Sequence, residues 1–366
     1  MSLFQNYKVI ELASVLAGPS VGQFFAELGA NVIKIENPKT EGDVTRSWKL
    51  KSENNESSIS AYFSSANWGK ESISLNIYID NDLQQLYTLI KEADIVIASY
   101  KPGDAEKLKV DYKTLSNINP QLIYGSITGY SSKSKVGYDA IIQAESGFMY
   151  MNGQKDSPPT KMPVALMDVL TAHQLKEGIL VALLNKTQTG QGDLVEVSLF
   201  DTAISSLANQ ATNYLMGNKI PERIGSEHPN IVPYGTVFYD KNNLPLVLAV
   251  GSDKQFKKLC EILKISEISE NENYSTNQQR VINRENALSI LSIEIKKTER
   301  TDLLNDLEKN NVPAGAVNTV QESLSTEDSQ RLILSNDDSK GVKNIAFRVG
   351  NMELNNGIIP PPEFDK

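Results

Sequence analysis

One carboxylate stands out in an otherwise apolar stretch of the chain. Asp168 lies in the sequence VALMDVLTA (164–172), and it is the only charged residue between Pro163 and Ala172. The pattern predicts that a long helix begins here, so Asp168 can cap the helix by accepting backbone N–H groups at the positive end of its dipole. A poorly hydrated carboxylate can also attack an acyl carbonyl as a nucleophile. The pattern alone leaves both interpretations open.

Other recognisable catalytic patterns are missing from the sequence. Its two histidines, His173 and His228, and its one cysteine, Cys260, do not have the spacing of a zinc site. There is no G-x-S-x-G elbow and no P-loop, and residues 13–20 lack the G-x-G-x-x-G pattern of dinucleotide binding. We interpret His173, in the middle of a predicted helix, as a packed or surface residue. These observations argue against zinc and NAD chemistry.

Composition and charge exclude further classes of function. The chain has 366 residues, with 36 basic and 45 acidic side chains and a net charge of −9, which argues against general binding of nucleic acid. The longest apolar runs, 178–184 and 244–251, are far shorter than the ~20 residues of a membrane span. We therefore expect no membrane segment. A single cysteine and an N-terminus without a signal-peptide pattern lead us to expect a cytoplasmic protein.

Strand and helix patterns alternate in the first half of the chain. Residues 8–12 and 31–36 have the pattern of strands, and the segment between them places Val21, Phe24 and Leu28 on one face of a helix. The alternation continues with a strand at 72–77, a helix at 80–93, and strands at 94–99 and 122–127. This order predicts an α/β fold with a parallel sheet that is covered on both faces.

The second half changes character near residue 218. Before it we expect helices at 139–151, 167–186 and 199–216 and a strand at 194–198; after it we expect a hairpin at 236–251 and helices at 253–264, 283–297 and 299–310. We interpret the polar segment 265–282 as an exposed connection. The pattern predicts a smaller α+β domain at 220–312, whereas 1–219 and 313–366 form the larger domain.

The order and spacing of ten short motifs give the chain a family resemblance. It resembles the class III CoA-transferases of the CaiB/BaiF type, which include formyl-CoA and carnitine CoA-transferases. The matching stretches are VIELASVLAGP (9–19), LGANVIKIENP (28–38), GDVTRSW (42–48), ADIVIASYKPG (93–103), GYDAIIQAESG (137–147), VALMDVLTA (164–172), KTQTGQGDLVEVSLFD (186–201), HPNIVPYGTV (228–237), VPAGAVNT (312–319) and PPP (360–362). The resemblance implies a Rossmann-like large domain built from both chain ends, a smaller domain between them, and an interlocked homodimer.

The resemblance also implies a reaction. A CoA-transferase of this class moves CoA from an acyl-CoA donor to a carboxylic acid, and its nucleophilic aspartate falls on Asp168. The implied intermediates are an aspartyl anhydride and an aspartyl-CoA thioester. Acyl-CoA and a small carboxylate are then the substrates, with no permanently bound cofactor and no metal. We expect the backbone around Ala17 and Gly18 to supply N–H donors to the tetrahedral intermediates.

Eight further residues lie on or beside motif segments that the resemblance places near CoA. Leu16 and Ala17 belong near the thioester, and Tyr138 belongs near the aspartate. The remaining expected contacts with CoA are Lys39, Arg46, Trp48, Lys101 and Lys107. For each cation a solvated surface position is an equal alternative, and Tyr138 has a core-packing alternative.

Two other functions remain open at this point. Racemases of 2-methylacyl-CoA belong to the same family and use a histidine where this chain has Tyr138, and tyrosine is a poor base at neutral pH. A non-catalytic CoA-binding subunit of a heteromeric transferase would have no need of Asp168. Leu16 also stands where formyl-CoA transferases have glutamine, and no glycine run precedes the predicted small domain, which argues against oxalate or formate as substrate.

Overall fold

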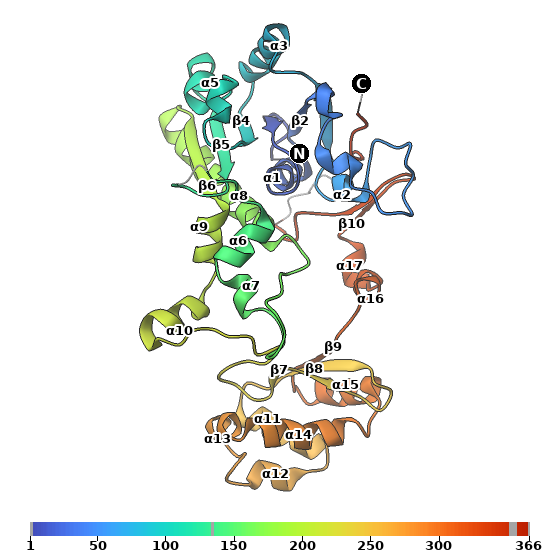
Figure 1. Ribbon diagram of the computed structural model, residues 1–366. Coiled ribbons are helices and arrows are strands. Elements are labelled where there is room, and N and C mark those ends of the chain that lie inside the picture. The colour runs from blue at the N-terminus through green and yellow to red at the C-terminus, as the bar shows by residue number, and fades with distance from the viewer. Residues whose placement is uncertain (1–2, 133–134, 351–356, 365–366) are drawn as a thin grey trace. The chain divides into compact units, whose positions relative to one another are not determined.

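The computed structural model describes residues 3–132, 135–350 and 357–364, and its largest sheet has six parallel strands (Figure 1). The strands are β1 (Lys8–Leu12), β2 (Asn31–Glu36), β3 (Lys70–Ser74), β4 (Ile95–Ser99), β5 (Ile123–Thr128) and β6 (Asp193–Ser198). Their order is β3-β2-β1-β4-β5-β6, which is the order of a Rossmann-like doubly wound sheet. The parallel α/β sheet expected from the sequence is confirmed.

Helices cover both faces of this sheet, which explains why its central strands are almost continuously apolar. On one face, α3 (Asp80–Ile90) and α5 (Tyr112–Ile118) bury Leu86 and Leu115 in a core with Ile10 and Val96. On the other face, α1 (Ala17–Glu27) and α8 (Leu166–Thr189) pack against the strands and against each other. Helix α8 ends at Gly190, whose φ of 70° suits the left-handed residue that closes many helices.

Segments far along the chain complete the same unit. Strand β11 (Lys340–Val342) pairs with β10 (Ile333–Ser335). The Glu27 carboxylate accepts the backbone N–H groups of Asn344 and Ile345 at 2.7 and 2.8 Å, and Gly69 N–H donates to the Ile359 carbonyl at 2.9 Å. The unit therefore includes residues from both ends of the described chain.

The described chain divides into two compact units. The larger contains Met1–Gly147, Met162–Thr212 and Glu327–Lys366, and the smaller contains Phe148–Lys161 and Asn213–Thr326. The smaller unit has an antiparallel sheet of β7 (Tyr234–Tyr239), β8 (Pro245–Ala249) and β9 (Ala314–Ala316), with α11 (Asp253–Ile262), α14 (Arg284–Ile295) and α15 (Arg300–Lys309). The domain boundaries expected at 219/220 and 312/313 stay a prediction about folding domains.

Several short elements complete the structure. They are the 3-10 helices η1 (Pro38–Thr40) and η2 (Val44–Ser47) and the helices α2 (Ala61–Ser64), α4 (Asp104–Lys107), α6 (Asp139–Glu145), α7 (Phe148–Met151), α9 (Leu199–Ser205), α10 (Asn209–Gly217), α12 (Ser266–Glu270), α13 (Asn277–Ile282), α16 (Val320–Leu324) and α17 (Glu327–Gln330). Among the described residues, no helix is both long enough and apolar enough to cross a membrane.

Three expectations about local structure are wrong. The helix expected at 139–151 is interrupted at Gly147, whose φ is 92°, and the helix expected at 199–216 breaks at Ala208, whose φ is 49°. The expected exposed connection at 265–282 contains α12, α13 and a fully buried Arg280. The Arg280 guanidinium donates to the Val232 and Tyr274 carbonyls and to Asp253, each at 2.8 Å. Partners distant in sequence hold this segment, so its local composition did not reveal it.

Candidate active site

A cavity of about 570 Å³ opens in the larger unit at the carboxyl ends of β1, β4 and β5. The strand order reverses direction between β1 and β4, and open α/β sheets bind ligands in the crevice that this reversal leaves. The loops after the three strands and the beginnings of α1, α6 and α8 line the cavity. The sheet topology therefore places the cavity where a ligand site is expected.

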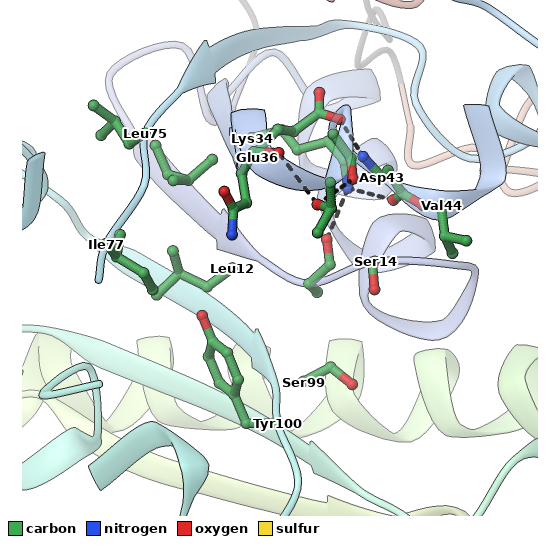
Figure 2. Close-up of a pocket in the computed structure, with 15 residues that line it drawn as sticks. Leu12, Ser14, Lys34, Glu36, Asp43, Val44, Leu75, Ile77, Ser99 and Tyr100 are labelled. Carbon is green, nitrogen blue, oxygen red and sulfur yellow. Dashed lines mark hydrogen bonds and ion pairs between the residues drawn. The ribbon is translucent and has the colours of Figure 1, made fainter. Parts of the chain in front are cut away.

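A second cavity, of about 430 Å³, adjoins the first and shares Ser14, Val44, Ser99 and Tyr100 with it. Figure 2 shows a cluster of charged side chains from β2 and the following loop on one wall, with Ser99 and Tyr100 at the end of β4 on the other. The two cavities together offer room for a ligand longer than the reaction centre itself.

The structure brings together most of the residues that the sequence singled out. Six of them line the larger cavity, namely Leu16, Ala17, Trp48, Lys101, Tyr138 and Asp168. They come from five different segments of the chain. Sequence spacing alone does not place these segments side by side, so their meeting at one cavity supports the interpretation of the motifs. Ala17 and Gly18 are the first two residues of α1, where backbone N–H groups have no acceptor within the helix.

Three of the expected cations, Lys39, Lys107 and Arg46, are not part of the lining of this cavity. Lys39 is exposed in η1, beside Thr40 in the lining of the smaller cavity. Lys107 is exposed on α4 and forms an ion pair with Asp104 at 2.9 Å. These two positions are compatible with the surface interpretation that the sequence left open.

Arg46 is occupied by a structural ion pair. Its guanidinium donates to the two Glu36 oxygens at 2.6 and 2.9 Å and to the Pro362 carbonyl at 3.0 Å, and it lies over the Phe63 ring. The side chain is 5% exposed. This placement argues against the expected contact with a phosphate, because the Arg46 guanidinium is buried and already donates two hydrogen bonds to the Glu36 carboxylate.

Asp168 does not cap the helix that it begins. The N-cap of α8 is Ala165, without a side-chain cap, and Asp168 is three residues further on. The carboxylate that accepts a backbone N–H here is Asp139, which bonds Met167 N–H at 2.8 Å. Within the described residues, the Asp168 side chain has no hydrogen bond or ion pair. Its carboxylate is thus left to the cavity.

The surroundings of Asp168 change its charge state. Burial, and secondarily the negative charge of Asp139, raises the pKa of Asp168 to about 7. Desolvation disfavours the charged form of a carboxyl group, and a second negative charge nearby acts in the same direction. Near neutral pH Asp168 exists in both protonation states. The pKa of Tyr62 is also raised, first by burial and then by the negative charge of Asp168.

Sequence reasoning missed two charged residues in the lining, Asp139 and Lys135. Asp139 directly follows Tyr138 in the GYD motif, so the motif contained the signal that would have identified it. It also accepts Gln143 Nε2–H at 2.7 Å, which orients the carboxylate that bonds α8. Lys135 pairs with Glu145, and nothing in its sequence surroundings distinguishes it from other surface lysines.

Comparison with known proteins agrees with this site. Residues 4–360 match CoA-transferase family III. The succinate–glutarate CoA-transferase of Agrobacterium fabrum is 40% identical over 322 residues, which is 86% of this chain and 80% of the relative. The succinyl-CoA:glutarate CoA-transferase of Mus musculus is 34% identical over 329 residues, 89% of this chain and 74% of the relative.

A solved structure has a similar fold. The CaiB/BaiF family protein of Brucella suis is 36% identical and superposes with a TM-score of 0.84, covering 98% of this chain and 95% of the other. The strand order, the cavity at its reversal and the match along nearly the full length lead to one assignment: the chain belongs to CoA-transferase family III.

Proposed function

We propose that this CoA-transferase works through covalent catalysis by Asp168. The observation that carries the proposal is the placement of the Asp168 carboxylate in the cavity without a hydrogen-bonding partner among the described residues. A carboxylate that neither caps its helix nor pairs with a cation is available to form a covalent bond. Burial deprives it of water, which strengthens its ionised form as a nucleophile.

The reaction has four steps in which each bond formed replaces one broken. An Asp168 oxygen attacks the thioester carbonyl of the donor, and the C–S bond breaks to release CoA thiolate and leave an anhydride. The thiolate then attacks the aspartyl carbonyl and expels the donor acid. An acceptor carboxylate attacks the resulting aspartyl-CoA thioester and again releases thiolate. The thiolate finally attacks the acceptor acyl carbonyl and returns Asp168 as a carboxylate.

The cavity supplies groups for binding and for charge stabilisation. The free N–H groups of Ala17 and Gly18 at the start of α1 are candidates to stabilise the tetrahedral intermediates. Leu16, Trp48 and Tyr138 offer apolar surface to the pantetheine and thioester parts of CoA. The smaller cavity gives the remainder of the ligand room, and Lys39 beside it remains a candidate for a phosphate contact.

We also propose that the exchanged acids are small dicarboxylates. The relatives described above carry succinate and glutarate in their names. While one carboxylate of such an acid attacks, or is bound as a thioester or an anhydride, the other carboxylate remains charged and needs a cation nearby. Lys101 in the lining offers such a charge, and Lys135 in the same lining carries a second one, which it shares with Glu145.

We propose that the active form is a homodimer, interlocked as the family resemblance implies. Apolar side chains are exposed on α8 and α10, including Val181 and Leu184 at 67% and 63% and Leu215 and Met216 at 75% and 88%. Apolar groups exposed in such numbers are typical of interaction surfaces. We place the enzyme in the cytoplasm, with which the buried free thiol of Cys260 is compatible.

Replacing the proposed nucleophile tests the mechanism. We expect Asp168→Ala to lower kcat by about 1,000-fold or more, since covalent catalysis is lost. The native enzyme, incubated with acyl-CoA and trapped with hydroxylamine, should yield a modified peptide that contains residue 168. Mass spectrometry locates the modification. Full activity in the variant, or a modification elsewhere, would refute the role of Asp168.

The pH dependence tests the electrostatic pairing with Asp139. Because ionised Asp168 attacks, kcat/KM should rise as pH increases through about 7. Asp139→Asn removes a negative charge that disfavours ionisation, so the pKa of Asp168 should fall and the rise should move to lower pH. Burial persists, so the pKa should stay above the ordinary 3.8. Asp201→Asn, on the exposed start of α9, is the control; equal shifts in both variants would contradict the pairing.

The substrate proposal predicts a selective change in KM. Lys101→Met and Lys135→Met should raise KM for glutarate or succinate, by about 10-fold in at least one of them, because a charge-assisted hydrogen bond is lost. KM for butyrate, which lacks the second carboxylate, should hardly change. Steady-state assays with a fixed acyl-CoA donor measure both, and Lys113→Met on the exposed face of α5 is the control. Equal effects on both acids would instead place the lysines against CoA.

Subunit exchange tests the interlocked dimer. Light scattering should give twice the chain mass of 40.4 kDa. Tagged and untagged dimers mixed under native conditions should not form mixed dimers, because interlocked chains separate only on unfolding. Mixed dimers should appear after joint denaturation and refolding. A monomeric mass contradicts the dimer, and rapid native exchange contradicts interlocking.

A further inference from the structure

Four charged side chains meet inside the larger unit, and two of them, Lys34 and Asp43, belong to the wall of the smaller cavity. Lys34 Nζ lies 2.9 Å from both Glu11 Oε1 and Asp43 Oδ2, and Lys70 Nζ lies 2.8 Å from Glu11 Oε2. All four residues are at most 4% exposed. A buried group of charges costs desolvation that apolar packing would avoid, so stability alone is a weak reason for it. Its other contacts indicate what it does.

The two lysines hold both ends of one segment, residues 13–19, which we call the first loop. Lys34 Nζ donates to the Ala13 carbonyl at 2.7 Å, and Lys70 Nζ donates to the Pro19 carbonyl at 2.9 Å. Burial opposes the charge of Lys34, yet the attraction of Glu11 and Asp43 holds its pKa above the ordinary value. The Ala13 carbonyl therefore faces a permanent cation, whereas burial lowers the pKa of Lys70, which bonds the Pro19 carbonyl, to about 8.

The middle of the first loop is strained. Val15 has a φ of 72°, a left-handed conformation that is rare and strained for a β-branched residue. Its N–H points at the Asp43 carboxylate, 3.3 Å from each oxygen. Thr45 fixes that carboxylate through its backbone N–H at 3.0 Å and its hydroxyl at 2.8 Å. Figure 2 shows Asp43 bonded within this cluster, beside Lys34.

The strained segment forms part of the wall around Asp168. Val15, Leu16 and Ala17 line the same cavity as Asp168. If Val15 relaxed to an ordinary φ, the direction of the chain through Leu16 would change, and with it the position of the first N–H groups of α1. The charge cluster thus opposes a relaxation that would reshape the reaction centre.

We propose that Asp43 and Lys34 are positioning residues for CoA transfer, which hold the first loop in its strained form through Val15 N–H and the Ala13 carbonyl. Neither residue needs to touch the reacting atoms. Their effect on the reaction rests on the proposed use of the Asp168 cavity. Their effect on the loop itself does not, so the two can be measured separately.

The test compares two buried carboxylates on the same structural unit. Asp43→Asn retains the shape of the side chain but removes the charge that attracts Val15 N–H and Lys34. Glu27→Gln is the matched control: Glu27 is 3% exposed and also accepts two backbone N–H groups, but at the opposite end of α1. Both variants lose one buried negative charge, and only one of them contacts the first loop.

Two measurements decide the outcome. Hydrogen exchange of peptides that cover residues 13–18 should become at least about 10-fold faster in Asp43→Asn than in the native protein and in Glu27→Gln. At equal fractions of folded protein, kcat should fall about 10-fold or more in Asp43→Asn and less than about 3-fold in the control. Unchanged exchange in Asp43→Asn overturns the inference. Faster exchange with unchanged kcat shows instead that the loop is held but is not used in the reaction.

A second substitution separates loop positioning from a general loss of folding. Val15→Gly accepts a φ of 72° without strain, so this variant should fold, and its own kcat is the reference for the second substitution. In the Val15→Gly background, Asp43→Asn should lower kcat much less than in the native background, because no strain remains to be opposed. An equal loss in both backgrounds would show that Asp43 acts otherwise than through Val15. If Asp168→Ala remained active, the proposed function would fail while the exchange result would stand.

Discussion

The close packing of α8 on the sheet is the constraint on which the site depends. Gly125 on β5 lets the helix approach so closely that an added Cβ would lie 3.0 Å from side-chain atoms of Leu175 and Ile179. From the helix side, a Cβ on Gly178 would lie 2.5 Å from Val195 Cγ1 on β6. These two glycines set the distance between helix and sheet. The first turn of α8, which carries Asp168, is positioned by contacts several turns away.

At the start of α8, two carboxylates serve two functions that a single carboxylate could not serve at the same time. A carboxylate at a helix N-terminus is stabilised by the amides there, but hydrogen bonds to those amides weaken it as a nucleophile. Asp139 takes the amide of Met167 from a different helix, and Asp168 keeps its oxygens free. Burial raises the pKa of Asp168, and the negative charge of the nearby Asp139 raises it further.

The sequence predicted what depends on local pattern and motif order, and it missed what depends on distant partners. Strands β1, β2, β4 and β5 follow from their apolar runs, and the motif series correctly gathered Leu16, Trp48 and Asp168 at one cavity. Arg46 looked like a phosphate ligand because its motif does not reveal Glu36 and Pro362 as its partners. The role of Asp139 and the burial of Arg280 depend likewise on contacts across the fold.

The path of the chain has a consequence for its synthesis. The larger unit receives Asn344, Ile345 and Pro362 only after the ribosome has made all of the smaller unit, since Asn213–Thr326 lies earlier in the chain. Until then the Glu27 carboxylate lacks the Asn344 and Ile345 amides, and Arg46 lacks the Pro362 carbonyl. The unit whose synthesis begins first is therefore completed last. A nascent chain carries its catalytic helix α8 on an incomplete scaffold, and its final ordering waits for a segment synthesised more than a hundred residues later.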